Sequence, residues 1–143
     1  MEDAMTSRLN PYLNFDGTAR TAIEFYTSVF GGELTVSTFG ENGMSDDPAE
    51  VDKVMHAQLT TGSGFTLMAS DTPPGIPAPS TEGNISISLS GAKADEAELK
   101  GYWSKLGEGG MAIMPLATAP WGDQFGMLKD RFGTTWMVNI AGT

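Results

Sequence analysis

The chain contains two copies of one pattern, and this internal repeat constrains its fold more than any local feature does. Gly64 and Gly133 each open an apolar segment, and a Met stands four positions later in both, at Met68 and Met137. The second segment follows the first by about half the chain. Because repeated segments build repeated units, we expect two similar modules within a single domain over residues 1–143.

The first module, at about residues 8–70, has the pattern of a strand, a helix and three more strands. Alternation of apolar and polar residues predicts strands at residues 10–16, 33–39, 54–60 and 65–70. In the third of these, Met55, Ala57 and Leu59 are predicted to face one side of the sheet and His56 and Gln58 the other. Helical spacing of apolar residues predicts a helix that Asp16 or Thr18 caps and Gly31 ends.

The second module repeats this order at about residues 84–141, after a Pro-rich connector at about 71–83. Asp95 and Glu96 begin its helix, where negative charge suits the helix dipole, and Gly107 ends it. Its first strand is predicted with Ile85, Ile87 and Leu89 facing inward. The strands of this module are expected at residues 84–90, 110–118, 124–129 and 134–140.

One face of each predicted sheet carries amides, hydroxyls and thioethers instead of aliphatic side chains. Sheets with one face packed on the core and one face exposed to solvent are common, so the simplest interpretation is that this face is a solvated surface. Alternatively, both sheets turn these faces toward one cavity for a small molecule. The residues on this face are Asn10, Tyr12, Asn14, His56, Gln58, Met68, Asn84, Ser86, Ser88, Met137 and Asn139.

Composition excludes several classes of function. The net charge of −10 would repel phosphate backbones, so nucleic-acid binding is not expected. The absence of Cys excludes disulfides, thiolate catalysis and thiolate metal ligands. No apolar run approaches the roughly 18 residues of a membrane span. Without a visible signal peptide, a cytoplasmic location and no membrane association are expected.

Several motifs are spread in order along the chain, including NPYLNF at residues 10–15, WGDQFGM at 121–127 and DRFGTTWMVN at 130–139. Together they resemble the PhnB-like branch of the vicinal oxygen chelate superfamily. The superfamily includes glyoxalase I, bleomycin-resistance proteins and extradiol dioxygenases. The resemblance implies an α+β fold of two βαβββ modules, whose mixed sheet forms a cup-shaped half-barrel with helices on its outer face. It also implies a homodimer.

The same resemblance points to four positions at which the metal enzymes of the superfamily carry His or Glu ligands. Here these positions are occupied by Asn10, Met68, Asn84 and Met137. Neutral amides and thioethers are poor ligands for Zn²⁺, Ni²⁺ or Fe²⁺, which favour imidazole or anionic donors. We therefore expect no metal at this site and no other cofactor.

His56, the only histidine, is the candidate base or ligand-binding group, since imidazole is the side-chain type suited to proton exchange near neutral pH. A hydrogen-bonded structural histidine is the alternative, and Tyr12, Asn14 and Gln58 are its possible partners. Trp121 and Phe125 would form a stacking wall with Asp123 as an anchor, or else cover a sheet edge or a dimer interface. The predicted ligand-binding set is Tyr12, Asn14, His56, Gln58, Met68, Ser86, Trp121, Phe125 and Met137.

Three functions remain open at this point. The first is binding of an unknown small molecule in the sheet cavity without the superfamily metal. The second is a metal-dependent lyase or isomerase of the glyoxalase type. The third is an interaction module whose cup is filled by its own side chains. Methyl transfer lacks support, because the chain has no Gly-rich first loop for S-adenosylmethionine.

Overall fold

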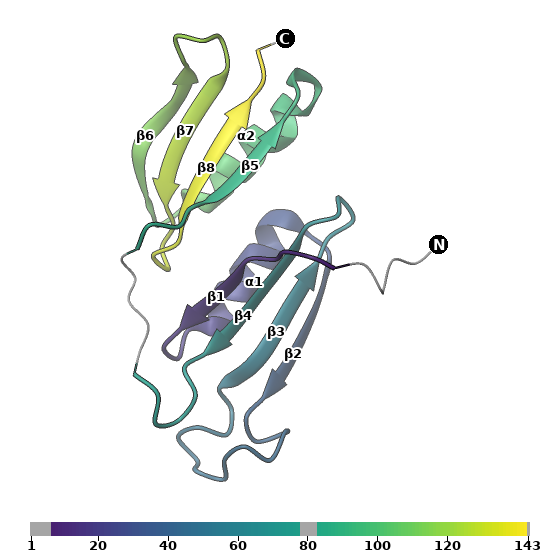
Figure 1. Ribbon diagram of the computed structural model, residues 1–143, viewed down its shortest axis with the longest axis vertical. Helices are drawn as coiled ribbons and strands as arrows, with labels where there is room; N and C mark the ends of the chain where they lie inside the picture. Colours follow the sequence, from purple (N-terminus) through teal and green to yellow (C-terminus); the bar gives the residue numbers. More distant parts are fainter. Residues whose placement is uncertain (1–6, 78–82, 143) are drawn as a thin grey trace. The chain divides into compact units, whose positions relative to one another are not determined.

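The computed structural model describes residues 7–77 and 83–142, which form two compact units, each built around one four-stranded sheet (Figure 1). The fold is α+β, and each unit has the order strand, helix and three strands, as the repeat predicted. The cup that the two sheets would form together, and the single domain, stay predictions. Within the described ranges, no helix is long and apolar enough to cross a membrane.

Module one consists of a sheet in the order β1-β4-β3-β2 and helix α1. β1 pairs with β4 in parallel, and the other neighbours are antiparallel, so the sheet is mixed. Its elements are β1 (Tyr12–Phe15), α1 (Ala19–Phe30), β2 (Glu33–Thr38), β3 (Val54–Thr60) and β4 (Thr66–Asp71).

Module two repeats this topology in the order β5-β8-β7-β6, again with a parallel pair, β5 and β8. A short 3-10 turn, Lys93–Asp95, precedes its helix. Its elements are β5 (Ile87–Gly91), α2 (Glu96–Leu106), β6 (Met111–Thr118), β7 (Gln124–Lys129) and β8 (Thr135–Ile140).

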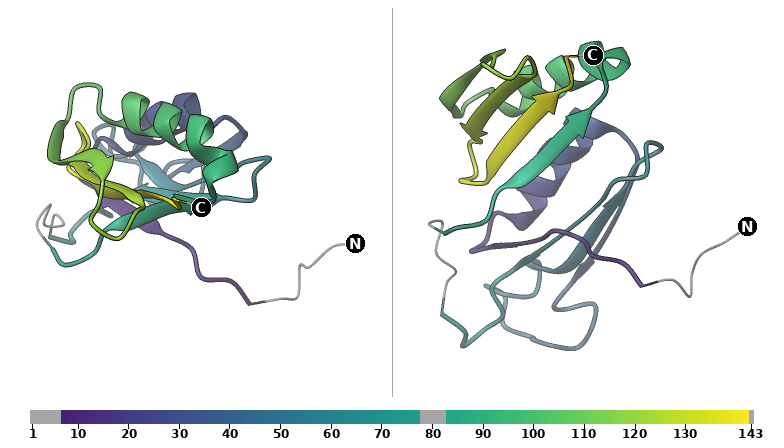
Figure 2. Two further views of the ribbon diagram at one scale, coloured as in Figure 1. Left: turned by 90° about the horizontal axis from the view of Figure 1, so that it is seen from above. Right: turned by 45° about the horizontal axis from the view of Figure 1, so that its top comes forward.

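Each helix covers one face of its own sheet and leaves the other face open (Figures 1 and 2). The buried apolar residues belong to the covered faces and to the facing sides of the helices. On α1, the residues spaced for one helical face are buried, with Ile23 and Tyr26 fully inaccessible. On β8, Trp136, Val138 and Ile140 alternate with half-buried neighbours. Burial therefore follows the predicted periodicities, 3.6 residues in the helices and two in the strands.

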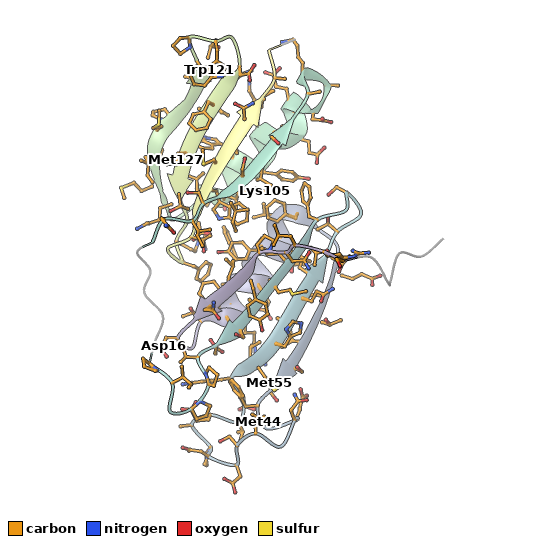
Figure 3. All side chains as sticks on the ribbon, viewed as in Figure 1. Asp16, Met44, Met55, Lys105, Trp121 and Met127 are labelled. Atoms are coloured by element: carbon orange, nitrogen blue, oxygen red, sulfur yellow. The ribbon has the colours of Figure 1, made fainter. Side chains whose placement is uncertain are left out.

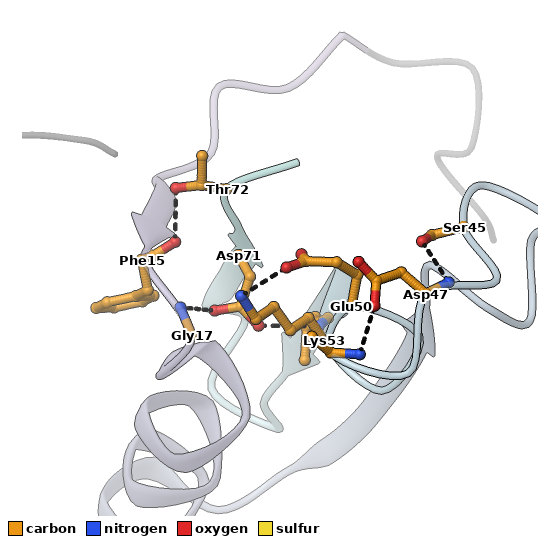
Figure 4. Close-up of polar contacts among 10 residues, drawn as sticks. Phe15, Gly17, Ser45, Asp47, Glu50, Lys53, Asp71 and Thr72 are labelled. Carbon is orange, nitrogen blue, oxygen red and sulfur yellow. Dashed lines mark hydrogen bonds and ion pairs between the residues drawn. The ribbon is translucent and has the colours of Figure 1, made fainter. Parts of the chain in front are cut away.

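The beginning of α1 is held by Asp71, a carboxylate at the end of β4, and not by a capping side chain beside the helix. Asp71 Oδ1 accepts the backbone N–H groups of Gly17 at 2.8 Å and Ala19 at 2.9 Å, and Oδ2 accepts that of Val54 at 2.9 Å (Figure 4). Thr18 occupies the N-cap position but makes no side-chain capping bond. The predicted cap at Asp16 or Thr18 was therefore wrong, because a residue distant in sequence satisfies these donors.

In module two, Asp130 organises the turn between β7 and β8. Its Oδ1 accepts the backbone N–H groups of Phe132 at 2.8 Å and Thr134 at 3.0 Å. Its Oδ2 accepts the indole N–H of Trp136 at 2.8 Å. Trp136 is 1% exposed, so its indole needs this buried partner, and Trp136 belongs to the core of module two.

Three details of the strand predictions were wrong. β1 begins at Tyr12 and not at residue 10, so Asn10 precedes the strand. β5 begins at Ile87 and not at residue 84. In the register that pairs Ile87 with Trp136, residues 84 and 85 lie opposite positions that precede β8, so they have no ladder partner. Ile85, predicted to face inward, is 83% exposed. In β3, a register shift opposite Ser37 and Thr38 makes Val54 the buried residue and leaves Met55 half-buried.

Glu96 links helix α2 to strand β7. Its Oε2 accepts hydrogen bonds from Lys100 Nζ at 2.6 Å and from Gln124 Nε2 at 3.0 Å. These two hydrogen bonds hold the pKa of Glu96 below its usual value, and the bond from Lys100 has the larger effect. Because this pKa is lower in the folded chain than in the unfolded chain, the stabilisation is complete above the unfolded-state pKa. It is lost as the pH falls through the folded-state pKa.

Lys100→Ala is expected to raise the pKa of Glu96 toward its ordinary value, because the first and strongest donor is removed. An NMR titration of the Glu96 side-chain carboxyl carbon measures this shift directly. Lys105→Ala, which removes an exposed lysine from the last turn of the same helix, is the control and should leave the titration unchanged. An unchanged Glu96 titration in the Lys100 variant would contradict the assignment.

Candidate functional site

The open face of the module-one sheet brings together most of the polar residues predicted there. Tyr12 of β1 lies beside Met68 of β4, which lies beside Gln58 of β3, so the three form one row across the sheet. Asn14 pairs with Ser70 in the next row. Because side chains at paired positions point to the same face, this surface is a shallow array of hydroxyl, amide and thioether groups.

Tyr12 and His56 form the most definite contact on this face. The Tyr12 Oη and His56 Nδ1 atoms are 3.2 Å apart, and the tautomer of His56 decides which atom donates. The ring centroids are 5.7 Å apart at an interplanar angle of 41°. Since β4 separates β1 from β3, Tyr12 reaches across the central strand to make this contact. Tyr12 is 43% exposed, and the pair is therefore accessible from solvent.

Of the three possible partners of His56, the structure shows Tyr12 in contact. Gln58 Nε2 instead donates to Thr60 Oγ1 at 3.3 Å, along its own strand. Asn14 is exposed on β1. Tyr12 and His56 therefore act as a pair, with a thioether and amides around them.

The open face of the module-two sheet is richer in thioethers and aromatic rings. Met137 of β8 lies beside Met127 of β7, and Phe125 lies beside Asn139 one row away. Trp121, in the turn before β7, is 66% exposed, and its ring centroid is 6.5 Å from that of Phe125. Trp121 and Phe125 thus form an accessible aromatic corner at one end of this face.

Three residues assigned to the site from sequence have other positions or partners. Asp123, the expected anchor, accepts hydrogen bonds from Asn139 Nδ2 at 3.1 Å and from the Gly142 backbone N–H at 3.0 Å. Its carboxylate therefore fastens the end of β8. Ser86 is exposed and precedes β5, as does Asn84, so neither occupies a ladder position of the sheet.

The donor groups at the four superfamily ligand positions do not fit a divalent transition metal. Asn10, Met68, Asn84 and Met137 supply amides and thioethers, while such metals favour imidazole, carboxylate or thiolate. Among residues 7–77 and 83–142, no group of three or more His, Asp or Glu side chains could hold a metal.

Sequence reasoning missed two features of the open faces. Met127 and Met114 join Met137 in one row, because β6, β7 and β8 place them at paired positions. Strand register decides this alignment, and a bulge in β6 shifts that register by one residue near Met114. The spacing of methionines along the chain predicts neither the pairing of these three methionines nor the bulge in β6.

A family model described as 3-demethylubiquinone-9 3-methyltransferase matches residues 7–139. A crystal structure of a protein from Pseudomonas aeruginosa is 41% identical, covering 95% of this chain and 98% of that one, with a TM-score of 0.79. A PhnB protein from Bacillus cereus is 26% identical, covering 94% and 100%, with a TM-score of 0.72.

The fold itself recurs more widely. A glyoxylase/bleomycin resistance protein/dioxygenase domain from Frankia sp. EAN1pec has a TM-score of 0.64 over 95% of this chain and 92% of that one. Its sequence identity of 13% means that the likeness concerns the fold alone. Matching topology across such different sequences shows the glyoxalase/bleomycin-resistance fold, on which many chemistries occur.

Proposed function

Since the chain belongs to the 3-demethylubiquinone-9 3-methyltransferase (PhnB-like) family and has the glyoxalase/bleomycin-resistance fold, we propose that it binds a small organic molecule on the open face of its module-one sheet. The Tyr12–His56 pair carries this proposal. It offers one hydrogen-bond donor, one acceptor and two aromatic rings within a single contact. The superfamily metal takes no part.

The chemistry around this pair favours a neutral ring compound with hydroxyl or amide groups. Tyr12 and His56 can each exchange a hydrogen bond with such a group, and a ring can pack on Met68 or against the aromatic side chains. Anionic ligands are disfavoured by the net charge of −10. A neutral ligand would make these contacts with Tyr12, His56 and Met68 without a Lys or Arg side chain.

The family's name refers to methyl transfer, but the chain has no Gly-rich first loop that would hold S-adenosylmethionine. A small-molecule site on the open sheet face is therefore the better-supported proposal.

Tyr12→Phe is expected to weaken binding of neutral ring probes, such as catechol and benzamide, by about two- to tenfold, the usual range for one lost hydrogen bond. NMR of the His56 ring during titration of each probe measures both the site and the affinity. Tyr102→Phe is the matched control. It also removes a bonded phenol, the one that donates to Glu98 at 2.6 Å within α2 of module two.

Three outcomes would overturn the proposal. The first is the absence of any His56 shift with these probes at millimolar concentration, and the second is equal weakening by both tyrosine variants. The third is one transition metal per chain in protein purified without chelator, with added Ni²⁺, Zn²⁺, Mn²⁺ or Fe²⁺ raising the melting temperature. This third result would favour the metal-dependent lyase or isomerase instead.

A further inference from the structure

Three methionines lie side by side on the open face of the module-two sheet. Met114 of β6 pairs with Met127 of β7, and Met127 pairs with Met137 of β8. The row crosses three neighbouring strands and continues to Ser88 on β5. It is a continuous line of thioethers, which we call the methionine row, defined by Met114, Met127 and Met137.

The geometry of a sheet allows these three sulfur atoms to converge. Side chains at directly paired positions have Cβ atoms about 4.5–5.5 Å apart and point to the same face. A Met side chain has three rotatable bonds and no branch, so the outer two can lean toward the central one. Met114 is 49% exposed, whereas Met127 and Met137 are half-buried. Met127, the central residue of the row, is labelled in Figure 3. The row is thus accessible from one side and supported by the sheet below.

Thioethers are soft donors, and among biological cations they favour Cu⁺. The chain contains no Cys, so no thiolate competes for such an ion. The net charge of −10 favours a cation near the protein. The opposing charge is Lys129, which lies on β7 two positions from Met127 and beside Thr135 and Met111. Its long side chain can extend into solvent away from the row.

We propose that the methionine row binds one Cu⁺ ion through the three thioether sulfurs of Met114, Met127 and Met137. This site shares Met137 with the superfamily ligand positions, but Met114 and Met127 lie outside them. It also differs in chemistry, because thioethers are poor ligands for the hard and borderline ions of the superfamily site. It is also independent of the proposed small-molecule site, which uses Tyr12 and His56 of module one. The ion is bound and released as Cu⁺, so no electron is transferred.

The test uses Ag⁺, a redox-inert cation with the same preference for thioethers, and the full chain with ¹³C-labelled Met methyl groups. We expect the methyl resonances of Met114, Met127 and Met137 to shift together and to stop shifting at one equivalent of Ag⁺. Met44, which is 60% exposed, and Met55 belong to module one and serve as internal controls that should not shift in this range.

Met127→Leu removes the central sulfur while nearly conserving volume, and we expect it to weaken Ag⁺ binding at least about tenfold. Met44→Leu is the matched control and should leave the titration unchanged. If Met127→Leu disturbs the dispersed methyl spectrum of the folded chain, Met114→Leu on the exposed edge strand replaces it. Equal shifts at all exposed methionines, binding at His56 alone, or unchanged affinity in a folded variant would each overturn the proposal.

Discussion

Replacing Asp71 with Ala is expected to lower the free energy of unfolding by about 3–5 kcal/mol, because several buried donors lose their acceptor at once. Asp71 is 2% exposed and accepts three backbone N–H groups, those of Gly17, Ala19 and Val54. Water cannot easily replace a carboxylate at this position. The substitution therefore frees the start of α1 and the start of β3 together (Figure 4).

Urea denaturation followed by circular dichroism measures this loss. Asp16→Ala removes an exposed carboxylate from the same turn and should change stability by no more than about 0.5 kcal/mol. The free energy of unfolding of Asp71→Asn should lie between those of Asp71→Ala and Asp16→Ala. The Asn amide keeps one acceptor oxygen, but its NH₂ group is a donor that faces one of the backbone N–H groups. Similar stabilities for Asp71→Ala and Asp16→Ala would show that the carboxylate does not hold these elements.

The second large effect is expected at Trp136. Trp136→Ala should lower the free energy of unfolding by about 3–5 kcal/mol, since it removes a large aromatic side chain from the core of module two. Trp136 is 1% exposed and donates its indole N–H to Asp130 Oδ2 at 2.8 Å. Trp136→Phe keeps most of the packing but loses the indole N–H donor. It should therefore lower the free energy of unfolding by less, about 1–3 kcal/mol.

The difference between the two Trp136 variants separates packing from hydrogen bonding, and denaturant unfolding provides both values. Trp121→Ala is the control, because this indole is 66% exposed and its loss should change stability little. The near-UV circular dichroism of Trp136 should disappear in both Trp136 variants. If Trp121→Ala proved as destabilising as Trp136→Ala, the assignment of Trp136 to the core would fail.

Periodicity predicted the fold well where burial alone decides the structure. The helix at α1 and the alternating strand β8 follow directly from their apolar spacing, because one face of each element is buried. Periodicity failed where pairing decides the structure. Ile85 continues the alternation of β5, yet the partner strand does not extend that far, and Ile85 stays exposed.

The candidate site was predictable only in part for the same reason. Alternation placed Tyr12 and His56 on one face, and the structure agrees. Their contact across β4, however, depends on strand order, which alternation does not specify. The bonds of Asp71 and Asp123 depend on where chain ends and loops return to the sheet, and no local pattern encodes them.

Asp71 and Asp130 each hold elements of their own module, and they close very different lengths of chain. Asp71 binds N–H groups that lie 54, 52 and 17 positions away, whereas the partners of Asp130 lie only 2, 4 and 6 positions away. A short loop closes at a lower entropic cost than a long one. The Asp130 turn can therefore form early, as a local event, while the Asp71 contacts must wait until almost all of module one has been synthesised and brought together. Both modules also need their long-range parallel pairs. Their carboxylates differ in role, because Asp71 fixes distant segments of module one while Asp130 fixes a single turn of module two.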